Sequence, residues 1–309
     1  MRSARQFGTL IGLVLLCAAL WILTPHFLTV SNLVNVVEQT SINAIVAAGM
    51  TFVILSGGID LSVGSIVALS GVVLGTALQG GQPLPLALTL ALAAGTACGL
   101  VNGALISWGR LPPFIVTLGT MSIARGAALL FTEGRPVSGF DATFRAIATG
   151  RVGFVPAPVI AMAVVYAVAH LVLARTTFGR YVYAIGGNEE ATRLSGVAVR
   201  FHKTMIYGVS GLMSASAAVL LTARLNSAQP IAGINYELDA IAATVIGGTS
   251  LMGGEGTLFG TLVGALIMGV LRNGLNLLGV SSFLQQIVIG AVIVVAVLLD
   301  TVLKRKHRM

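Results

Sequence analysis

The sequence predicts an all-α integral membrane protein of about ten transmembrane helices, and three observations lead to that prediction. The chain has 309 residues, of which 56% are hydrophobic. Only 9% are charged, against about 25% in an ordinary soluble domain. The 38 glycines are spread through apolar runs, which is typical of helices that pack closely in a bilayer. This composition excludes a soluble enzyme, a disordered chain and a nucleic-acid-binding domain.

Ten apolar segments approach the length of about 20 residues that a helix needs to cross the hydrocarbon core. Two of them, 42–57 and 238–252, are short, and each ends at a glycine pair. The connections leave no room for a soluble domain, so residues 1–309 are predicted to form a single membrane domain. The segments are roughly 7–24, 42–57, 61–79, 84–106, 113–131, 156–174, 204–223, 238–252, 257–278 and 283–301.

The first segment is predicted to remain as a helix rather than to be removed as a signal peptide. Two arginines precede it, as in such peptides, but the sequence Thr24-Pro25-His26-Phe27 that follows it contains no small-residue cleavage site.

Basic residues predict the orientation, because loops rich in Lys and Arg stay in the cytoplasm. With both termini in the cytoplasm, twelve basic residues lie inside and four outside, which places 175–203 inside and 132–155 outside. Arg125 and Arg272 fall within segments. The inside set is Arg2, Arg5, Arg110, Arg175, Arg180, Arg193, Arg200, Lys203, Lys304, Arg305, Lys306 and Arg308, and the outside set is Arg135, Arg145, Arg151 and Arg224.

Two glycine-rich stretches interrupt the apolar pattern. In 56–65, a glycine pair weakens the helix, and Asp60 and Ser62 offer oxygens that cap the next one. The stretch is either a plain turn between helices or a broken helix beside a water-filled path. A similar break lies at 246–256. Its glycine pair, Gly253-Gly254, follows the pair Gly57-Gly58 by 196 residues, which suggests a parallel internal repeat.

The long connection 175–203 is predicted to contain a short amphipathic helix. Asn188 is a good N-cap, Glu189 and Glu190 suit the first turn, and Gly196 is a plausible stop. A solvated loop is the alternative. The apolar stripe favours a helix that docks on a cytoplasmic partner, and it consists of Ala191, Leu194 and Val197.

Several polar side chains fall within or beside the apolar segments. Such groups face the interior of a helix bundle or a water-filled cavity. They either pair with one another and with carbonyl groups, as Arg125 and Arg272 would, or line a passage for a polar, uncharged solute. The candidates for such a passage are Asp60, Asn102, Arg125, Asn273, Asn276 and Gln285.

No motif for covalent chemistry is present. The sequence contains no G-x-x-x-x-G-K-[ST] loop, and the four histidines and two cysteines show no catalytic or metal-ligand spacing. The chain is therefore expected to be no enzyme, and to have no catalytic residue, metal site or cofactor of its own.

The sequence resembles the membrane permease subunits of bacterial ABC importers for simple sugars, most closely the ribose-type permeases. The resemblance runs from about residue 25 to 300. The matching stretches are Gly58-Ile59-Asp60-Leu61-Ser62-Val63-Gly64-Ser65, Gly186-Gly187-Asn188-Glu189 through Ala191-Thr192-Arg193-Leu194-Ser195-Gly196, Ala228-Gln229-Pro230, Tyr236 to Ala243 and Asn273 to Ser282.

This resemblance implies a multi-pass protein of the bacterial inner membrane that pairs with a second permease copy within the lipid. It also implies a cytoplasmic ATPase subunit that holds ATP and Mg²⁺, and a periplasmic or tethered sugar-binding protein. The family's coupling helix would span Asn188 to Gly196, with Thr192 and Arg193 among its residues. Nucleosides, branched-chain amino acids and autoinducer sugars remain alternative solutes. An ion-coupled secondary transporter is a further alternative, although the segments lack a chain of buried carboxylates.

Overall fold

The computed structural model describes the backbone of residues 2–308 and the side chains of residues 8–295, 297 and 298. Within this part the chain forms thirteen helices and four strands of two residues each. The elements are α1 (Arg2–Leu23), α2 (Val30–Leu55), α3 (Val63–Gln79), α4 (Leu84–Ser107), α5 (Pro113–Thr132), β1 (Val137–Ser138), α6 (Ala142–Thr149), β2 (Arg151–Val152), β3 (Val155–Pro156), α7 (Ala157–Arg175), α8 (Thr177–Gly187), α9 (Glu189–Leu194), α10 (Val199–Leu225), β4 (Ser227–Ala228), α11 (Tyr236–Ile246), α12 (Leu258–Leu277) and α13 (Ser282–Arg308).

The prediction of an all-α membrane protein is confirmed. Six helices are long and apolar enough to cross a membrane, namely α2, α4, α5, α7, α10 and α12. Each of the ten predicted segments overlaps a helix of the structure. Six overlap these helices, and the other four overlap α1, α3, α11 and α13. Large apolar side chains point outward from these helices; Ile123 and Leu130 of α5 are 73% and 78% exposed. Such a surface suits lipid rather than water.

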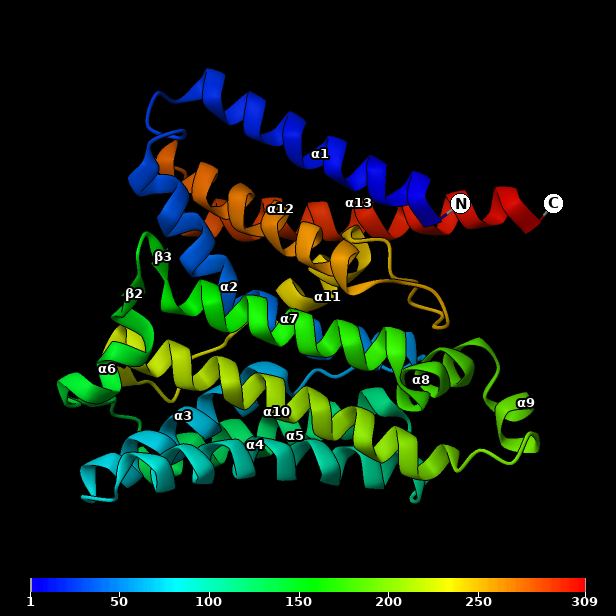
Figure 1. Cartoon of the computed structure of the whole chain (residues 1–309), viewed down its shortest axis with the longest axis horizontal. Coiled ribbons are helices and arrows are strands. Elements are labelled where there is room, and N and C mark those ends of the chain that lie inside the picture. The colour runs from blue at the N-terminus through cyan, green and yellow to red at the C-terminus, as the bar shows by residue number, and fades with distance from the viewer. Residues whose placement is uncertain (1, 309) are drawn as a thin grey trace.

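Helix α2 forms the centre of the molecule. It packs against α7, α10, α11 and α12, which surround it in Figure 1. The side chains of Ile45, Phe52 and Leu55 are almost completely buried in the main apolar cluster. The hydroxyl group of Tyr166 on α7 donates a hydrogen bond of 2.9 Å to the carbonyl of Ala44. From Ala44 to Leu55 the helix is buried on all sides, as an apolar stretch of helix in the core requires.

Glycines bring α4 and α10 into close contact, as their number in the sequence suggested. A Cβ atom at Gly99 would collide with the backbone of Tyr207, and one at Gly103 would collide with the backbone of Thr204. Gly211 on α10 meets Gly95 in the same way. Small residues thus let the two backbones approach each other, as in other membrane helix pairs.

Three predicted boundaries are wrong by six residues or more, and one of them is the end of the last helix, which was expected at 301 and lies at Arg308. The helix expected at 42–57 begins at Val30, because Thr29 caps it by accepting a hydrogen bond from the Asn32 backbone amide. The helix expected at 238–252 ends at Ile246, because Gly248 has a φ of 88° and turns the chain out of the helix. The start of α2 was missed because polar residues occupy its first turns. The end of α11 was missed because apolar residues follow Gly248.

Local structure that the sequence did not predict fills both long connections. Residues 132–155 contain α6, capped by the Asp141 side chain, and parts of two small antiparallel ladders. One ladder pairs Val137 with Ala228, so this connection lies against the end of α10. The connection 175–203 contains α8 before the predicted helix. The terminal residues counted for orientation, Arg2, Arg5, Lys304, Arg305, Lys306 and Arg308, have side chains outside the described set.

Candidate functional site

The predicted short helix exists as α9, and its first turn is built as the sequence suggested. The Asn188 side chain accepts a hydrogen bond of 2.9 Å from the Ala191 backbone amide, which satisfies one of the free donors at the helix start. Glu189 and Glu190 occupy the first turn. Gly196 has a φ of 85°, which a residue with a side chain rarely adopts, so it ends the segment.

The apolar stripe on the exposed surface of α9 is shorter than predicted. Leu194 is 75% exposed and Ala191 is also exposed, while Thr192 is buried against the rest of the protein. Val197 was expected to extend the stripe. It lies beyond the end of the helix and is half-buried, because the chain turns at Gly196.

Charged pairs hold α9 in place. The Lys203 ammonium group on α10 lies 2.9 Å from the Glu189 carboxylate, which ties the two helices together. Arg193 donates two hydrogen bonds to Glu190, of 3.0 and 2.5 Å. These hydrogen bonds lower the pKa of the Glu190 carboxyl group below its usual value. Both side chains of the second pair are exposed, so its contribution to stability is small.

A glycine junction connects α8, which leads into α9, to both glycine-rich breaks. We define it as Gly57, Gly186, Gly253 and Gly254. The Gly254 amide donates a hydrogen bond of 2.9 Å to the carbonyl of Leu55 at the end of α2. A Cβ atom at Gly186 would collide with that same carbonyl and with the Gly254 amide. Three backbones therefore meet here with no room for a side chain.

Asp60 lies in a fully buried hydrogen-bond network. Its Oδ1 atom accepts from the Ser62 backbone amide at 3.0 Å and from the Ser62 hydroxyl at 2.6 Å. Its Oδ2 atom accepts from the Ser210 hydroxyl on α10 at 2.8 Å. Asn102 on α4 donates to the Ser62 hydroxyl at 2.9 Å and accepts from Thr120 on α5. The network thus joins the first break to three helices.

The prediction that Asp60 caps the next helix is wrong. The N-cap of α3 is Ser62, and it makes no side-chain capping bond. The Asp60 carboxylate instead accepts hydrogen bonds from Ser62, two residues further on, and from Ser210 on α10, because a buried carboxylate needs several donors. Asp60 and Asn102 are both 0% exposed. In this conformation both side chains are therefore bonded to other protein groups and have no contact with solvent.

Arg125 pairs with carbonyl groups, which is one of the two roles considered for it. Its guanidinium group donates hydrogen bonds of 2.7 Å to the carbonyls of Pro230 and Ala232. It thereby holds the connection between β4 and α11 against α5.

The other three candidates lie where α12 ends and α13 begins. Asn273 exchanges two side-chain hydrogen bonds with Asn32 on α2, of 2.9 and 3.0 Å. Asn276 accepts a hydrogen bond of 2.8 Å from Gln285 on α13. The six candidates therefore form separate groups around Asp60, Arg125 and α12 rather than one site. Within the described side chains, no three His, Cys, Asp or Glu residues are arranged to hold a metal ion.

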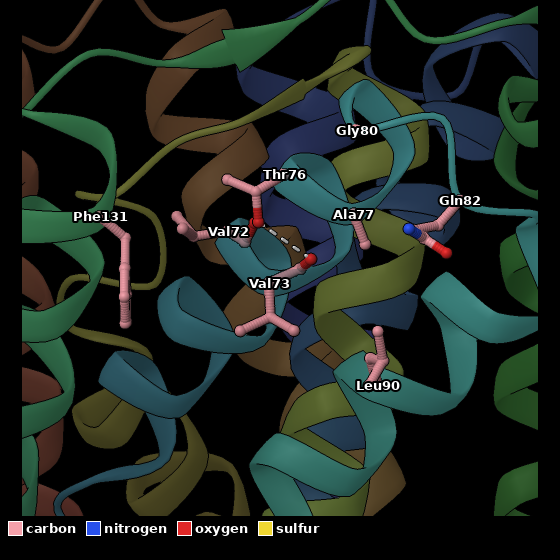
Figure 2. Close-up of a pocket in the computed structure, with 8 residues that line it drawn as sticks. All are labelled: Val72, Val73, Thr76, Ala77, Gly80, Gln82, Leu90 and Phe131. Atoms are coloured by element: carbon pink, nitrogen blue, oxygen red, sulfur yellow. Dashed lines mark hydrogen bonds between the residues drawn. The ribbon is translucent and has the colours of Figure 1, made fainter.

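A surface pocket of about 410 Å³ lies beside α3, and Figure 2 shows its lining. Its polar members are Thr76 and Gln82, and the Thr76 hydroxyl already donates to the carbonyl of Val72 at 2.8 Å. The pocket has few free hydrogen-bonding groups, so its lining suits an apolar contact better than a polar solute. The lining residues are Val72, Val73, Thr76, Ala77, Gly80, Gln82, Leu90 and Phe131.

Comparison with known proteins identifies the class. Residues 32–297 match the family described as the permease component of the branched-chain amino acid transport system. This match covers most of the length of the chain, which therefore belongs to that family of transport permeases.

The relatives within this class include permeases for ribose. The chain is 49% identical over 300 residues to the ribose import permease protein of Haemophilus influenzae, covering 96% of this chain and 93% of the relative. It is 50% identical over 296 residues to the ribose import permease protein of Escherichia coli K12, covering 94% and 92%. The D-allose transport system permease protein of Escherichia coli K12 is 39% identical over 302 residues, covering 97% and 93%. No solved structure matches.

Sequence reasoning missed several partners that complete these groups. Ser210 lies 150 residues from Asp60, and Asn32 lies 241 residues from Asn273. Thr120 comes from a different helix than Asn102. A polar residue in an apolar segment was the available signal, but it does not say which helix supplies the partner. The helix α8 had a clearer signal, since Phe178, Val182 and Ile185 follow helical spacing.

Proposed function

We propose that this chain is the membrane permease subunit of an ATP-binding cassette importer that carries a ribose-type monosaccharide into the cell. The single observation that supports this most strongly is the identity of about half of all residues, over nearly the whole chain, to ribose import permeases. Identity to the D-allose permease is lower, at 39%.

The energy source in this proposal is a separate subunit. The sequence has no phosphate-binding loop, so ATP and Mg²⁺ bind to a cytoplasmic ATPase and this chain has no cofactor of its own. A substrate-binding protein delivers the sugar from outside, and a second copy of the permease completes the membrane part.

Helix α9 is the proposed docking element for the ATPase. Its Leu194 side chain is largely exposed, while Lys203 and the buried Thr192 fix the helix to the permease. An exposed leucine on a fixed helix suits insertion into a cleft of a partner. The glycine junction then carries movement of α8 and α9 to both breaks at the centre of the molecule.

In the proposed topology the chain crosses the inner membrane of a bacterium ten times, and both termini lie in the cytoplasm. This topology rests on the twelve-to-four distribution of basic residues. Helix α11 has eleven residues and is too short to cross alone. Together with the second break it forms one discontinuous span, comparable to α2 with the first break.

Uptake of radiolabelled ribose tests the substrate. The permease is reconstituted in liposomes with its ATPase and binding protein, and unlabelled ribose, allose, galactose, a nucleoside and leucine are added as competitors. We expect ribose to compete most strongly. Stronger competition by another solute would assign the importer to that solute instead.

A further inference from the structure

A line of polar side chains on α2 has no role in the groups described above. Asn35, Gln39 and Asn43 follow one another at a spacing of four residues, which places them on one face of the helix. Over eight residues this face extends for about 12 Å. Asn35 and Gln39 are exposed and Asn43 is half-buried.

Three charged residues from other helices join this face. Arg224, at the end of α10, donates a hydrogen bond of 3.5 Å to the Asn35 side-chain oxygen. Asp239 on α11 accepts a hydrogen bond of 3.3 Å from Asn43 and two from Arg272 on α12, of 2.9 and 2.8 Å. We call the set Asn35, Gln39, Asn43, Arg224, Asp239 and Arg272 the polar stripe.

The polar stripe runs from the outer end of α2 to membrane depth. Helix α2 has 26 residues and is long and apolar enough to span the bilayer. Asn43 is near its middle, about 20 Å from its first residue at 1.5 Å per residue. Amide and charged groups at this depth avoid lipid and face protein or a water-filled cavity. Asn35, beside Arg224, lies at the outer end of α2, whereas Gln39 and Asn43 lie further along the helix. Gln39 is exposed in the single chain, so water or protein rather than lipid must surround it.

The side chains that remain open suit a polyhydroxylated solute. Gln39 donates one hydrogen bond to Asn35, and its amide oxygen is free to accept from another group. Arg272 is fixed by the buried Asp239 carboxylate, yet its side chain is 42% exposed. Asp239 offsets the charge of Arg272, so the groups that remain open along α2 offer several hydrogen-bond donors and acceptors to a neutral, hydroxylated molecule.

We propose that the polar stripe is one wall of the solute path and that it exchanges hydrogen bonds with the hydroxyl groups of a monosaccharide during passage. This inference rests on the proposed importer function and adds the residues that line the path. Arg224 lies at the end of α10 and marks one mouth of the path.

Chemical labelling tests whether water reaches the polar stripe. Gln39→Cys is placed in a background in which Cys17 and Cys98 are replaced by serine, and the complete permease is embedded in liposomes. A water-soluble maleimide that does not cross membranes should modify Gln39→Cys. The control Val164→Cys lies on the exposed, apolar face of α7 and should not react. Equal lack of reaction at both positions would overturn the proposal.

Uptake tests whether the polar stripe contacts the sugar. In the reconstituted importer, Gln39→Leu should slow ribose uptake about three- to tenfold, the value of one lost hydrogen bond. Gln39→Asn should recover most of the rate. The control Thr89→Val removes an exposed hydroxyl that only bonds within α4, and should transport normally.

Uptake at the normal rate by Gln39→Leu would overturn the proposal. Failure of the importer function itself has a different signature, since the unmodified protein would then show no ATP-dependent uptake. The labelling experiment still decides in that case, because it requires no transport.

Discussion

Asp60 accepts three hydrogen bonds, two from Ser62 and one from Ser210, which is far away in the sequence. Replacing Asp60 by leucine would leave these buried donors without an acceptor. Each such group costs about 1–3 kcal/mol, so we expect Asp60→Leu to lower the free energy of unfolding by at least about 3 kcal/mol.

Thermal unfolding of the purified permease in detergent measures this loss. Ser216→Ala serves as the matched control, because its hydroxyl only bonds to the carbonyl of Leu212 in its own helix. An unfolding temperature for Asp60→Leu equal to that of the control would mean that the network does not stabilise the first break.

At the scale of single residues, the sequence predicted local contacts better than distant ones. Asn188 caps α9 as expected, because its partner is only three residues away. The partners of Asp60 were not predicted, because Ser210 lies 150 residues along the chain and only the packing of α10 on the first break brings it near. Arg125 was expected to meet a carboxylate or carbonyl groups, but nothing in the sequence selected Pro230 and Ala232.

Between elements, the glycine junction offers a comparison of two neighbouring positions. A Cβ atom at Gly186 would collide with backbone from α2 and from the second break, whereas one at Gly187 would meet nothing within 4 Å. We expect Gly186→Ala to reduce ATP-dependent uptake at least tenfold, because α8 would be pushed away from both breaks. Gly187→Ala should keep normal uptake. Equal uptake by the two variants would show that α8 does not need this close contact.

The exposed leucine of α9 gives a second prediction between elements. Leu194→Asp places a charge where an apolar anchor is required, and loss of such an anchor typically costs about 2 kcal/mol or more of binding free energy. We expect the ATPase to be lost when this variant is purified and sugar uptake to stop. Leu194 is 75% exposed, so the permease itself should still fold.

Two further variants of the same segment are compared with Leu194→Asp. Arg193→Ala should have a milder effect, because Arg193 bonds to Glu190 of its own helix. Gly196→Val should weaken ATPase binding, because a β-branched residue is strained at a φ of 85°. If Leu194→Asp keeps both the ATPase and normal uptake, α9 is not the docking element.

The helix boundaries show what apolar patterns can and cannot predict. Most segments were found within a few residues, because a run of about 20 apolar residues has the length that a helix needs to cross the bilayer. The start of α2 was missed by twelve residues, because Asn32, Asn35, Glu38 and Gln39 made 30–41 look like a loop. Asn35 and Gln39 also belong to the polar stripe. The residues that concealed the start of α2 are therefore the ones to which we assign a function.

For the whole molecule, the distribution of basic residues predicts the topology. In a background without the two native cysteines, Ser195→Cys should react with an impermeant thiol reagent only after the cells are opened. Thr149→Cys, in the connection predicted to lie outside, should react in intact cells. Labelling of Ser195→Cys from outside would reverse the orientation and remove α9 as a candidate for cytoplasmic docking.

The central claim is that this chain is a passive membrane subunit driven by a separate ATPase. The most direct test compares driving forces for ribose uptake into liposomes. We expect the purified chain alone to hydrolyse no ATP and to transport no sugar under a proton or sodium gradient. Addition of the ATPase, ATP, Mg²⁺ and the loaded binding protein should start uptake. Gradient-driven uptake by the chain alone would contradict the claim and identify an ion-coupled secondary transporter.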